Sequence, residues 1–261
     1  MSARTYEIAR GVHWLPLRGA NVYFVRSGEA WQLIDAGFPG SAGIVADAAE
    51  RLCGAAGRPQ SILLTHGHPD HTGSAVALAA AWDVPILAPA AEMPFIDGTR
   101  LYPEPLVFWL SRILPRRAME ALVRGSDLGD AVRPFEPRAG VPGLPDWTVV
   151  PTPGHTPGHI AFFRPGDRTL IAGDAVLTLA WSSRLGGDCG WLWDLVRRKP
   201  RLSGPPTVFT CDWRDAAASV AALAELDPWV LATGHGRPLA GRQAAPALRA
   251  FAARVAASPP S

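Results

Sequence analysis

The sequence predicts an α/β fold in which short strands alternate with helices. Strand-like runs rich in β-branched and aromatic residues recur in both halves of the 261-residue chain, and runs with helical apolar spacing follow several of them. Glycine and proline, 26 of each, occur without a period, as tight turns between short elements require. The chain is long enough to bury a substantial core, and we expect one domain over residues 1–261.

In the first third, two short strands at 21–26 and 31–34 are separated by Gly28 and Glu29, which predict a hairpin turn. Ser41 is a suitable N-cap for the helix that follows. The next expected elements are a helix at 41–53, a buried strand at 61–65, an alanine-rich helix at 72–82 and a strand at 84–87.

The second half repeats this alternation. The expected strands are 147–151, 160–163, 169–171, 208–210 and 229–232, and the expected helices are 215–226 and 244–257. Between the halves, residues 92–146 show no regular alternation, and Pro115 would kink or split a helix in their apolar and basic part. We interpret 92–146 as an insertion that packs over the active site.

Composition excludes several classes of protein. A net charge of +2 gives no reason to expect a nucleic-acid partner. No apolar run approaches the roughly 20 residues of a membrane span, and the N-terminus lacks the apolar centre of a signal peptide, so we expect a cytoplasmic protein without a membrane partner. The three cysteines form no CxxC pair and are interpreted as ordinary thiols. Nothing in the sequence indicates an oligomeric state.

A dense cluster of histidine and aspartate directly follows the strand expected at 61–65. The run THGHPDH at 65–71 holds three histidines and one aspartate. Imidazoles and carboxylates are the natural ligands of zinc and similar divalent ions. Because His66 and His68 alternate, an extended loop can direct both rings at one ion, whereas Asp70 and His71 follow a turn and can face a second ion.

Three further potential ligands stand beside glycine at the ends of other expected strands. His155 lies in PGHTPGH after 147–151, Asp174 lies in GD after 169–171, and His235 lies in GHG after 229–232. Ligands gather at strand ends in α/β sheets. A lone loop histidine is usually structural, but with the first cluster these residues supply the ligands that two ions would still need.

The order His-x-His-x-Asp-His, Pro-Gly-His, Gly-Asp and Gly-His-Gly resembles the metallo-β-lactamase superfamily, and is similar within it to the glyoxalase II-like and lactonase-like hydrolases. The resemblance covers about residues 21–239, with little match over 92–146. It implies a four-layer αβ/βα sandwich with metals at one edge between the two sheets. It also implies two divalent ions, of which zinc is the expected one and iron or manganese are compatible.

The resemblance further implies the roles of individual residues. One ion would be bound by His66, His68 and His155, the other by Asp70, His71 and His235, and Asp174 would bridge both. Asp70 and Asp174 would carry catalytic roles as well as ligand roles. Asp35, in LIDAG, would orient a ligand histidine, because such imidazoles usually donate their other N–H to an acceptor; His159 would have a supporting role.

Such a site implies hydrolysis of a small molecule. A metal-bridging hydroxide would attack an ester, thioester, lactone or related bond, and no protein nucleophile is required. Tyr102, Trp109 and Trp181 are candidate substrate contacts, although such residues more often serve packing. The lactonase-like enzymes carry a tyrosine shortly after the bridging aspartate, whereas here AVLTL follows Asp174.

Three alternatives are compatible with parts of the pattern. A mononuclear iron persulfide dioxygenase would use His66, His155 and Asp174. A phosphodiesterase or nuclease would be expected to carry a basic surface or an added RNA-binding domain, and neither is evident. A non-catalytic binding module would be expected to have lost ligands, yet all seven are present.

Overall fold

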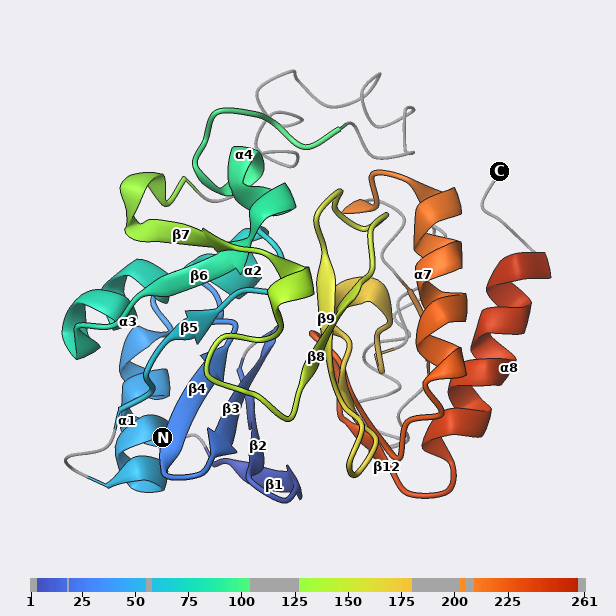
Figure 1. The fold of residues 1–261 in the computed structure, drawn as a ribbon, viewed down its shortest axis with the longest axis horizontal. Coiled ribbons are helices and arrows are strands. Elements are labelled where there is room, and N and C mark those ends of the chain that lie inside the picture. The colour runs from blue at the N-terminus through green and yellow to red at the C-terminus, as the bar shows by residue number, and fades with distance from the viewer. Residues whose placement is uncertain are drawn as a thin grey trace. The chain divides into compact units, whose positions relative to one another are not determined.

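A computed structural model describes residues 4–17, 19–54, 58–103, 127–179, 202–204 and 209–257 (Figure 1). These residues belong to two compact units. The first unit comprises the described residues within Met1–Arg100 and Gly125–Val149, and the second those within Leu101–Arg124 and Val150–Ser261. Each unit contains one sheet with its own helices and its own apolar core.

The first unit is built on a seven-stranded sheet with the strands in chain order. The first four strands pair antiparallel, and the fourth to seventh pair parallel. The strands are β1 (Tyr6–Ala9), β2 (Val12–Pro16), β3 (Asn21–Ser27), β4 (Ala30–Ile34), β5 (Ile62–Leu63), β6 (Ile86–Pro89) and β7 (Val132–Phe135).

Helices α1 and α3 supply the apolar side chains that cover this sheet. Val45 and Ala48 of α1 and Leu78 of α3 are fully or almost fully buried in one cluster with strand residues such as Leu33 and Ile62. Full burial of a valine, leucine or isoleucine side chain contributes roughly 1.5–3 kcal/mol. The helical segments of this unit are α1 (Ala42–Cys53), α2 (Pro69–Thr72), α3 (Ala75–Trp82), α4 (Met93–Ile96), η1 (Ala90–Glu92), η3 (Gly129–Ala131) and η4 (Pro137–Ala139).

The second unit is built on a five-stranded sheet of order β12-β11-β10-β9-β8, in which β10 and β11 pair parallel. Its helices α7 and α8 bury apolar faces, including Leu223 and Leu248, in one cluster with Leu170 and Leu231 of the strands. The elements are β8 (Thr148–Pro151), within which the unit boundary falls, β9 (Ile160–Arg164), β10 (Thr169–Ile171), η5 (Gly173–Ala175), α7 (Trp213–Glu225), β11 (Val230–Ala232), β12 (Leu239–Ala240) and α8 (Ala244–Ala257).

The predicted mixed α/β class, with two sheets and helices, is confirmed. The helix expected at 72–82 is found as α3, which begins at Ala75, whereas Thr72 is the last residue of the short helix α2. The strand expected at 61–65 pairs only over Ile62–Leu63, and the described part of 208–210 is not a strand.

The segment interpreted as an insertion, 92–146, contains an unpredicted strand. β7 pairs with β6 and forms the edge of the first sheet, where Pro134 is tolerated. Residues 104–126 lie outside the described residues, so packing of this segment over the active site stays a prediction, as does the single-domain organisation. Within the described part of the chain, no helix has the length and apolar character needed to cross a membrane.

Candidate metal centre

The loop that follows β5 carries the first group of potential metal ligands. β5 lies between β4 and β6 and pairs parallel with both, so the chain leaves it at the carboxyl edge of the parallel strands. The histidines of this loop, His66, His68 and His71, are buried, and the Asp70 side chain is 19% exposed. The edge of the first sheet therefore presents three imidazoles and a carboxylate within six residues.

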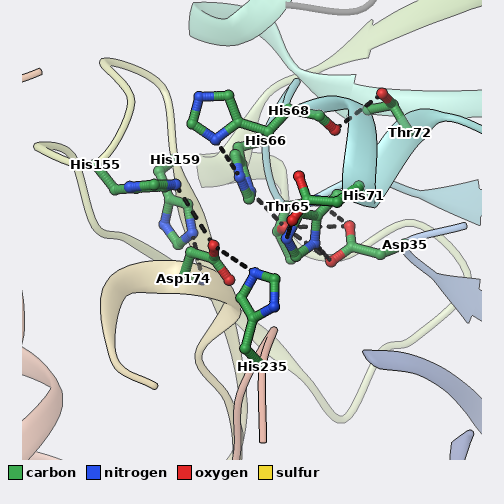
Figure 2. Close-up of polar contacts among 11 residues, drawn as sticks. Asp35, Thr65, His66, His68, His71, Thr72, His155, His159, Asp174 and His235 are labelled. Carbon is green, nitrogen blue, oxygen red and sulfur yellow. Dashed lines mark hydrogen bonds and ion pairs between the residues drawn. The ribbon is translucent and has the colours of Figure 1, made fainter. Parts of the chain in front are cut away.

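Asp35, directly after β4, organises this loop. Its carboxylate accepts hydrogen bonds from the Thr65 backbone N–H (2.9 Å) and the Thr65 hydroxyl, and its Oδ2 lies 2.8 Å from Nδ1 of His71 (Figure 2). Asp35 has a φ of 60°, a left-handed conformation that aspartate tolerates better than most residues. Because Nδ1 of His71 donates to Asp35, Nε2 is the nitrogen left for a metal, and it lies 3.5 Å from Oδ2 of Asp70.

The first two histidines of the loop face each other through ring nitrogens. Nε2 of His66 lies 3.1 Å from Nδ1 of His68. On the other side of the His66 ring, Nδ1 lies 3.0 Å from the hydroxyl of Thr65. That hydroxyl donates its hydrogen to Asp35 and can accept one from His66 Nδ1–H, which leaves Nε2 of His66 as the nitrogen without a hydrogen. His66 and His68 thus present two nitrogens suited to one cation.

A close backbone approach fixes the end of this loop. The Ala36 N–H donates to the carbonyl oxygen of His71 at 2.6 Å. Two residues later, a Cβ on Gly73 would lie 2.2 Å from Cδ of Pro39 and 2.4 Å from its nitrogen. Only glycine permits this contact, which holds the chain after the ligands against the loop that begins at Asp35.

The second unit carries the other three potential ligands. β10 and β11 end side by side, with Ile171 paired to Ala232, and the chain continues from them to Asp174 and His235. Nε2 of His235 lies 3.1 Å from Oδ2 of Asp174, and Nε2 of His155 lies 3.6 Å from the same oxygen (Figure 2). Two imidazoles from different loops are therefore directed at one carboxylate.

Backbone contacts hold the two loops that carry His155 and His235. A Cβ on Gly154, whose φ is 123°, would lie 2.1 Å from the Ala216 nitrogen in the first turn of α7, so the His155 loop packs directly on that helix. The His235 carbonyl accepts hydrogen bonds from the hydroxyls of Thr233 (2.7 Å) and Thr178 (3.1 Å). These interactions fix the backbone from which each imidazole projects.

His159 is buried behind Asp174 in the same unit. Its Nδ1 lies 2.7 Å from the Thr152 hydroxyl, and its Nε2 lies 3.0 Å from the backbone nitrogen of Asp174. The His155 and His159 rings lie edge to face, with centroids 5.9 Å apart. His159 thus contacts the ligand set through the backbone of Asp174.

The predicted substrate contacts Tyr102, Trp109 and Trp181 stay predictions. Tyr102 is buried, with 3% of its surface exposed, and Trp109 and Trp181 lie outside the described residues. His13 lies on β2, and its pKa is lowered by burial, with the Glu7 carboxylate acting in the opposite direction. The sequence indicated no role for the threonines that contact the ligand loops. Thr65, Thr152 and Thr233 lie just after strand ends, and Thr178 lies in an isolated β-bridge with Gly236.

The donor set fits a divalent metal. In the described residues it consists of imidazoles and carboxylates, the chemistry that zinc and related ions prefer. The ligand atoms offered by His66 and His68 lie within 4.8 Å of one another, and the same holds for Asp70 with His71 and for Asp174 with His235. Buried hydrogen-bond acceptors fix the ring orientation of His66 and His71, as expected of metal ligands. Fold and side chains together define a metal-binding α/β protein.

Comparison with known proteins identifies the class. The family model described as the metallo-β-lactamase superfamily matches residues 15–235, and the chain belongs to that family. It is 38% identical over 251 residues to "Probable metallo-hydrolase YflN" of Bacillus subtilis, covering 92% of this chain and 89% of that protein. It is 30% identical over 205 residues to a hydroxyacylglutathione hydrolase of Bdellovibrio bacteriovorus, covering 77% of this chain and 66% of the relative.

The fold is shared with a solved member of the family. The metallo-β-lactamase FIM-1 from Pseudomonas aeruginosa, in a mono-zinc form, aligns with a TM-score of 0.60 and 16% identity over 99% of this chain and 98% of that one. Family membership and the histidine and aspartate groups support a metal-dependent hydrolase.

Proposed function

We propose that this chain is a hydrolase with two metal ions that cleaves an ester, thioester, lactone or related bond in a small molecule. The observation that carries the proposal is a complete set of seven potential histidine and aspartate ligands in a chain of this family, in which His66 and His71 each have a buried partner on Nδ1. By the family pattern, His66, His68 and His155 would bind one ion, Asp70, His71 and His235 would bind the other, and Asp174 would be shared.

The chemistry that bound metals supply is a water made acidic enough to ionise near neutral pH and a positive charge to stabilise an oxyanion. The protein's own residues have the task of placing the donors. Asp35 keeps the proton of His71 on Nδ1, and Thr65 does the same for His66, so that Nε2 of each ring is free of hydrogen. Oδ2 of Asp174 lies near Nε2 of both His155 and His235, so this carboxylate would be available to ions held by either histidine.

Zinc is the proposed metal. Five imidazoles and two carboxylates suit zinc, and the same set accepts iron and manganese. A thioester is the first substrate class to test, because a relative that is 30% identical is named hydroxyacylglutathione hydrolase. A lactone is less favoured, because no tyrosine follows Asp174 closely. The small net charge supports a small-molecule substrate and no nucleic acid.

The test combines metal analysis with a substrate panel. The protein is purified without added metal, its zinc, iron and manganese contents are measured, and the same sample is assayed on small esters, thioesters and lactones. We expect about two zinc ions per chain, with turnover lost in His68→Ala and retained in His13→Ala, a histidine on β2 that serves as the matched control.

One iron per chain, with no hydrolysis and with oxygen consumption on a persulfide, would replace the proposal by the dioxygenase alternative. Two metals per chain without turnover on the panel, but with cleavage of a phosphodiester, would replace the proposed bond class. Turnover that survives in His68→Ala at the wild-type rate would refute the ligand assignment.

A further inference from the structure

His159 is the one histidine of PGHTPGH that the proposed ligand set does not use. Its side chain is almost fully buried, with 1% of the residue exposed, and both ring nitrogens lie within hydrogen-bond distance of groups in the second unit. It occupies the start of the connection into β9, four residues after the ligand His155. A buried imidazole with two defined partners has a defined protonation pattern.

The proton positions follow from the partners. The backbone nitrogen of Asp174 can only donate, so Nε2 of His159, at 3.0 Å, must accept and carries no hydrogen. A neutral imidazole then carries its hydrogen on Nδ1, which donates to the Thr152 hydroxyl at 2.7 Å. Two nitrogens on opposite sides of one rigid ring thus connect the end of β8 to the backbone of Asp174.

Backbone contacts anchor this ring to its strand. The Thr152 N–H donates to the carbonyl oxygen of His159 at 2.9 Å, and the Thr152 hydroxyl lies 3.4 Å from the same oxygen. Thr152 and His159 are therefore joined through both backbone and side chain. The ring cannot turn without breaking the Nδ1 contact, so the acceptor nitrogen stays directed at Asp174.

The backbone of Asp174 is held from a second direction. The preceding residue, Gly173, accepts a hydrogen bond through its carbonyl from the Gly234 N–H at 2.8 Å. The amide of Asp174 and the carbonyl of Gly173 belong to one peptide group, which is thus fixed at both ends. The carboxylate that projects from it has its Oδ2 between Nε2 of His155, at 3.6 Å, and Nε2 of His235, at 3.1 Å.

We propose that His159 is a positioning residue that acts as a neutral histidine protonated on Nδ1, holds the backbone amide of Asp174, and thereby sets the place of the carboxylate shared by the metals. The inference rests on the proposed function only for the role of that carboxylate. The proton pattern of His159 belongs to the protein without metal and can be tested there.

The side-chain chemistry explains why histidine suits this position. An acceptor must face the amide while a donor faces Thr152, and the imidazole supplies both on one rigid ring. Glutamine offers a carbonyl oxygen to the amide on a flexible side chain, whereas leucine offers none and leaves the Asp174 N–H with its acceptor removed. His159→Gln should therefore keep part of the positioning of the Asp174 amide.

The first experiment measures the ring protons of His159 in the metal-free protein by nitrogen NMR, with His159→Gln used to assign its signal. We expect the signature of a neutral ring with hydrogen on Nδ1, and Thr152→Val should shift that signal, whereas Thr152→Ser should leave it in place. A hydrogen found on Nε2 would overturn the proposal, whether or not the protein proves to be a hydrolase.

The second experiment measures zinc binding by competition with a chromophoric chelator. His159→Leu should weaken the zinc site by about 10–100-fold, the usual effect of losing a group behind a metal ligand. His159→Gln should lose less, and His13→Leu, the matched control, should bind as the wild type does. Wild-type affinity in His159→Leu would refute the positioning role; if that variant does not fold, Thr152→Val supplies the same comparison. Failure of the wild type itself to bind metal would instead refute the proposed function.

Discussion

Replacing Asp35 with asparagine isolates one contact behind a ligand histidine. Asparagine tolerates the φ of 60° at this position, so the backbone should not change. Its oxygen can still accept from the Thr65 N–H, but its NH2 group then faces Nδ1 of His71 across 2.8 Å. Two donors cannot face each other, so the His71 proton must move to Nε2, the nitrogen required for the metal. Rotating the amide only transfers the conflict to the Thr65 N–H.

The expected magnitude follows from these contacts. Loss of such a partner lowers metal affinity by about 10–100-fold, which corresponds to about 1.4–2.8 kcal/mol of binding free energy. In the metal-free protein the same change should lower the free energy of unfolding by roughly 1.5–3 kcal/mol, the usual contribution of a hydrogen bond to a charged group. Zinc affinity is measured by chelator competition, and the stability of the metal-free protein by urea unfolding. If the free energy of unfolding falls but zinc affinity stays at the wild-type value, the reasoning is refuted, and Asp35 only stabilises the loop.

Three further changes test separate parts of the structure. Gly73 has a helical φ of −61°, so Gly73→Ala should lower stability by about 1–3 kcal/mol through clashes with Pro39 and with the Pro69 carbonyl oxygen, without backbone strain. Gly43→Ala, in open space on α1, should instead raise stability by up to about 1 kcal/mol, and urea unfolding of both variants measures the difference. Burial raises the pKa of Cys53 to about 11, so little of this thiol is ionised at pH 8. Its alkylation by iodoacetamide at that pH should be on the order of a hundredfold slower than that of an exposed thiol. An equal rate would contradict the raised pKa. Burial lowers the pKa of His13 below 6.5, so its contribution to stability is present above that pH and is lost as the pH falls. In urea unfolding measured against pH, His13→Gln should therefore lose less stability below pH 6.5 than the wild type. An equal loss in both proteins would contradict the prediction.

Much of the fold was predictable because local pattern and tertiary environment agree. The strand predicted at 169–171 is β10, and the helix predicted at 244–257 is α8. Both contribute apolar side chains to the core of the second unit, so their periodicity reports a real buried face. β7 was missed because it is a short edge strand that contains a proline, and its pairing with β6 depends on a partner more than 40 residues away.

The ligands themselves were also open to prediction, for a different reason. Imidazole and carboxylate chemistry is visible in the residue type, and strand ends place such residues at one edge of each sheet. The groups behind the ligands were harder to find. Thr65 contacts Asp35 across 30 positions, and Thr178 contacts Thr233 across 55, and no local pattern distinguishes these threonines from others.

The groups behind the ligands influence how tightly a cluster of histidines can bind a metal. A neutral imidazole has one nitrogen with a hydrogen and one without, and only the latter can be a ligand. In His71 and His66 the hydrogen is held on Nδ1 by Asp35 and Thr65, so in the proposed site Nε2 of each ring would be the atom that binds a metal. His159 applies the same chemistry in reverse, because its bare nitrogen accepts from the Asp174 amide instead of binding an ion. Two histidines four residues apart, His155 and His159, are therefore assigned different roles by their neighbours and not by the sequence around them.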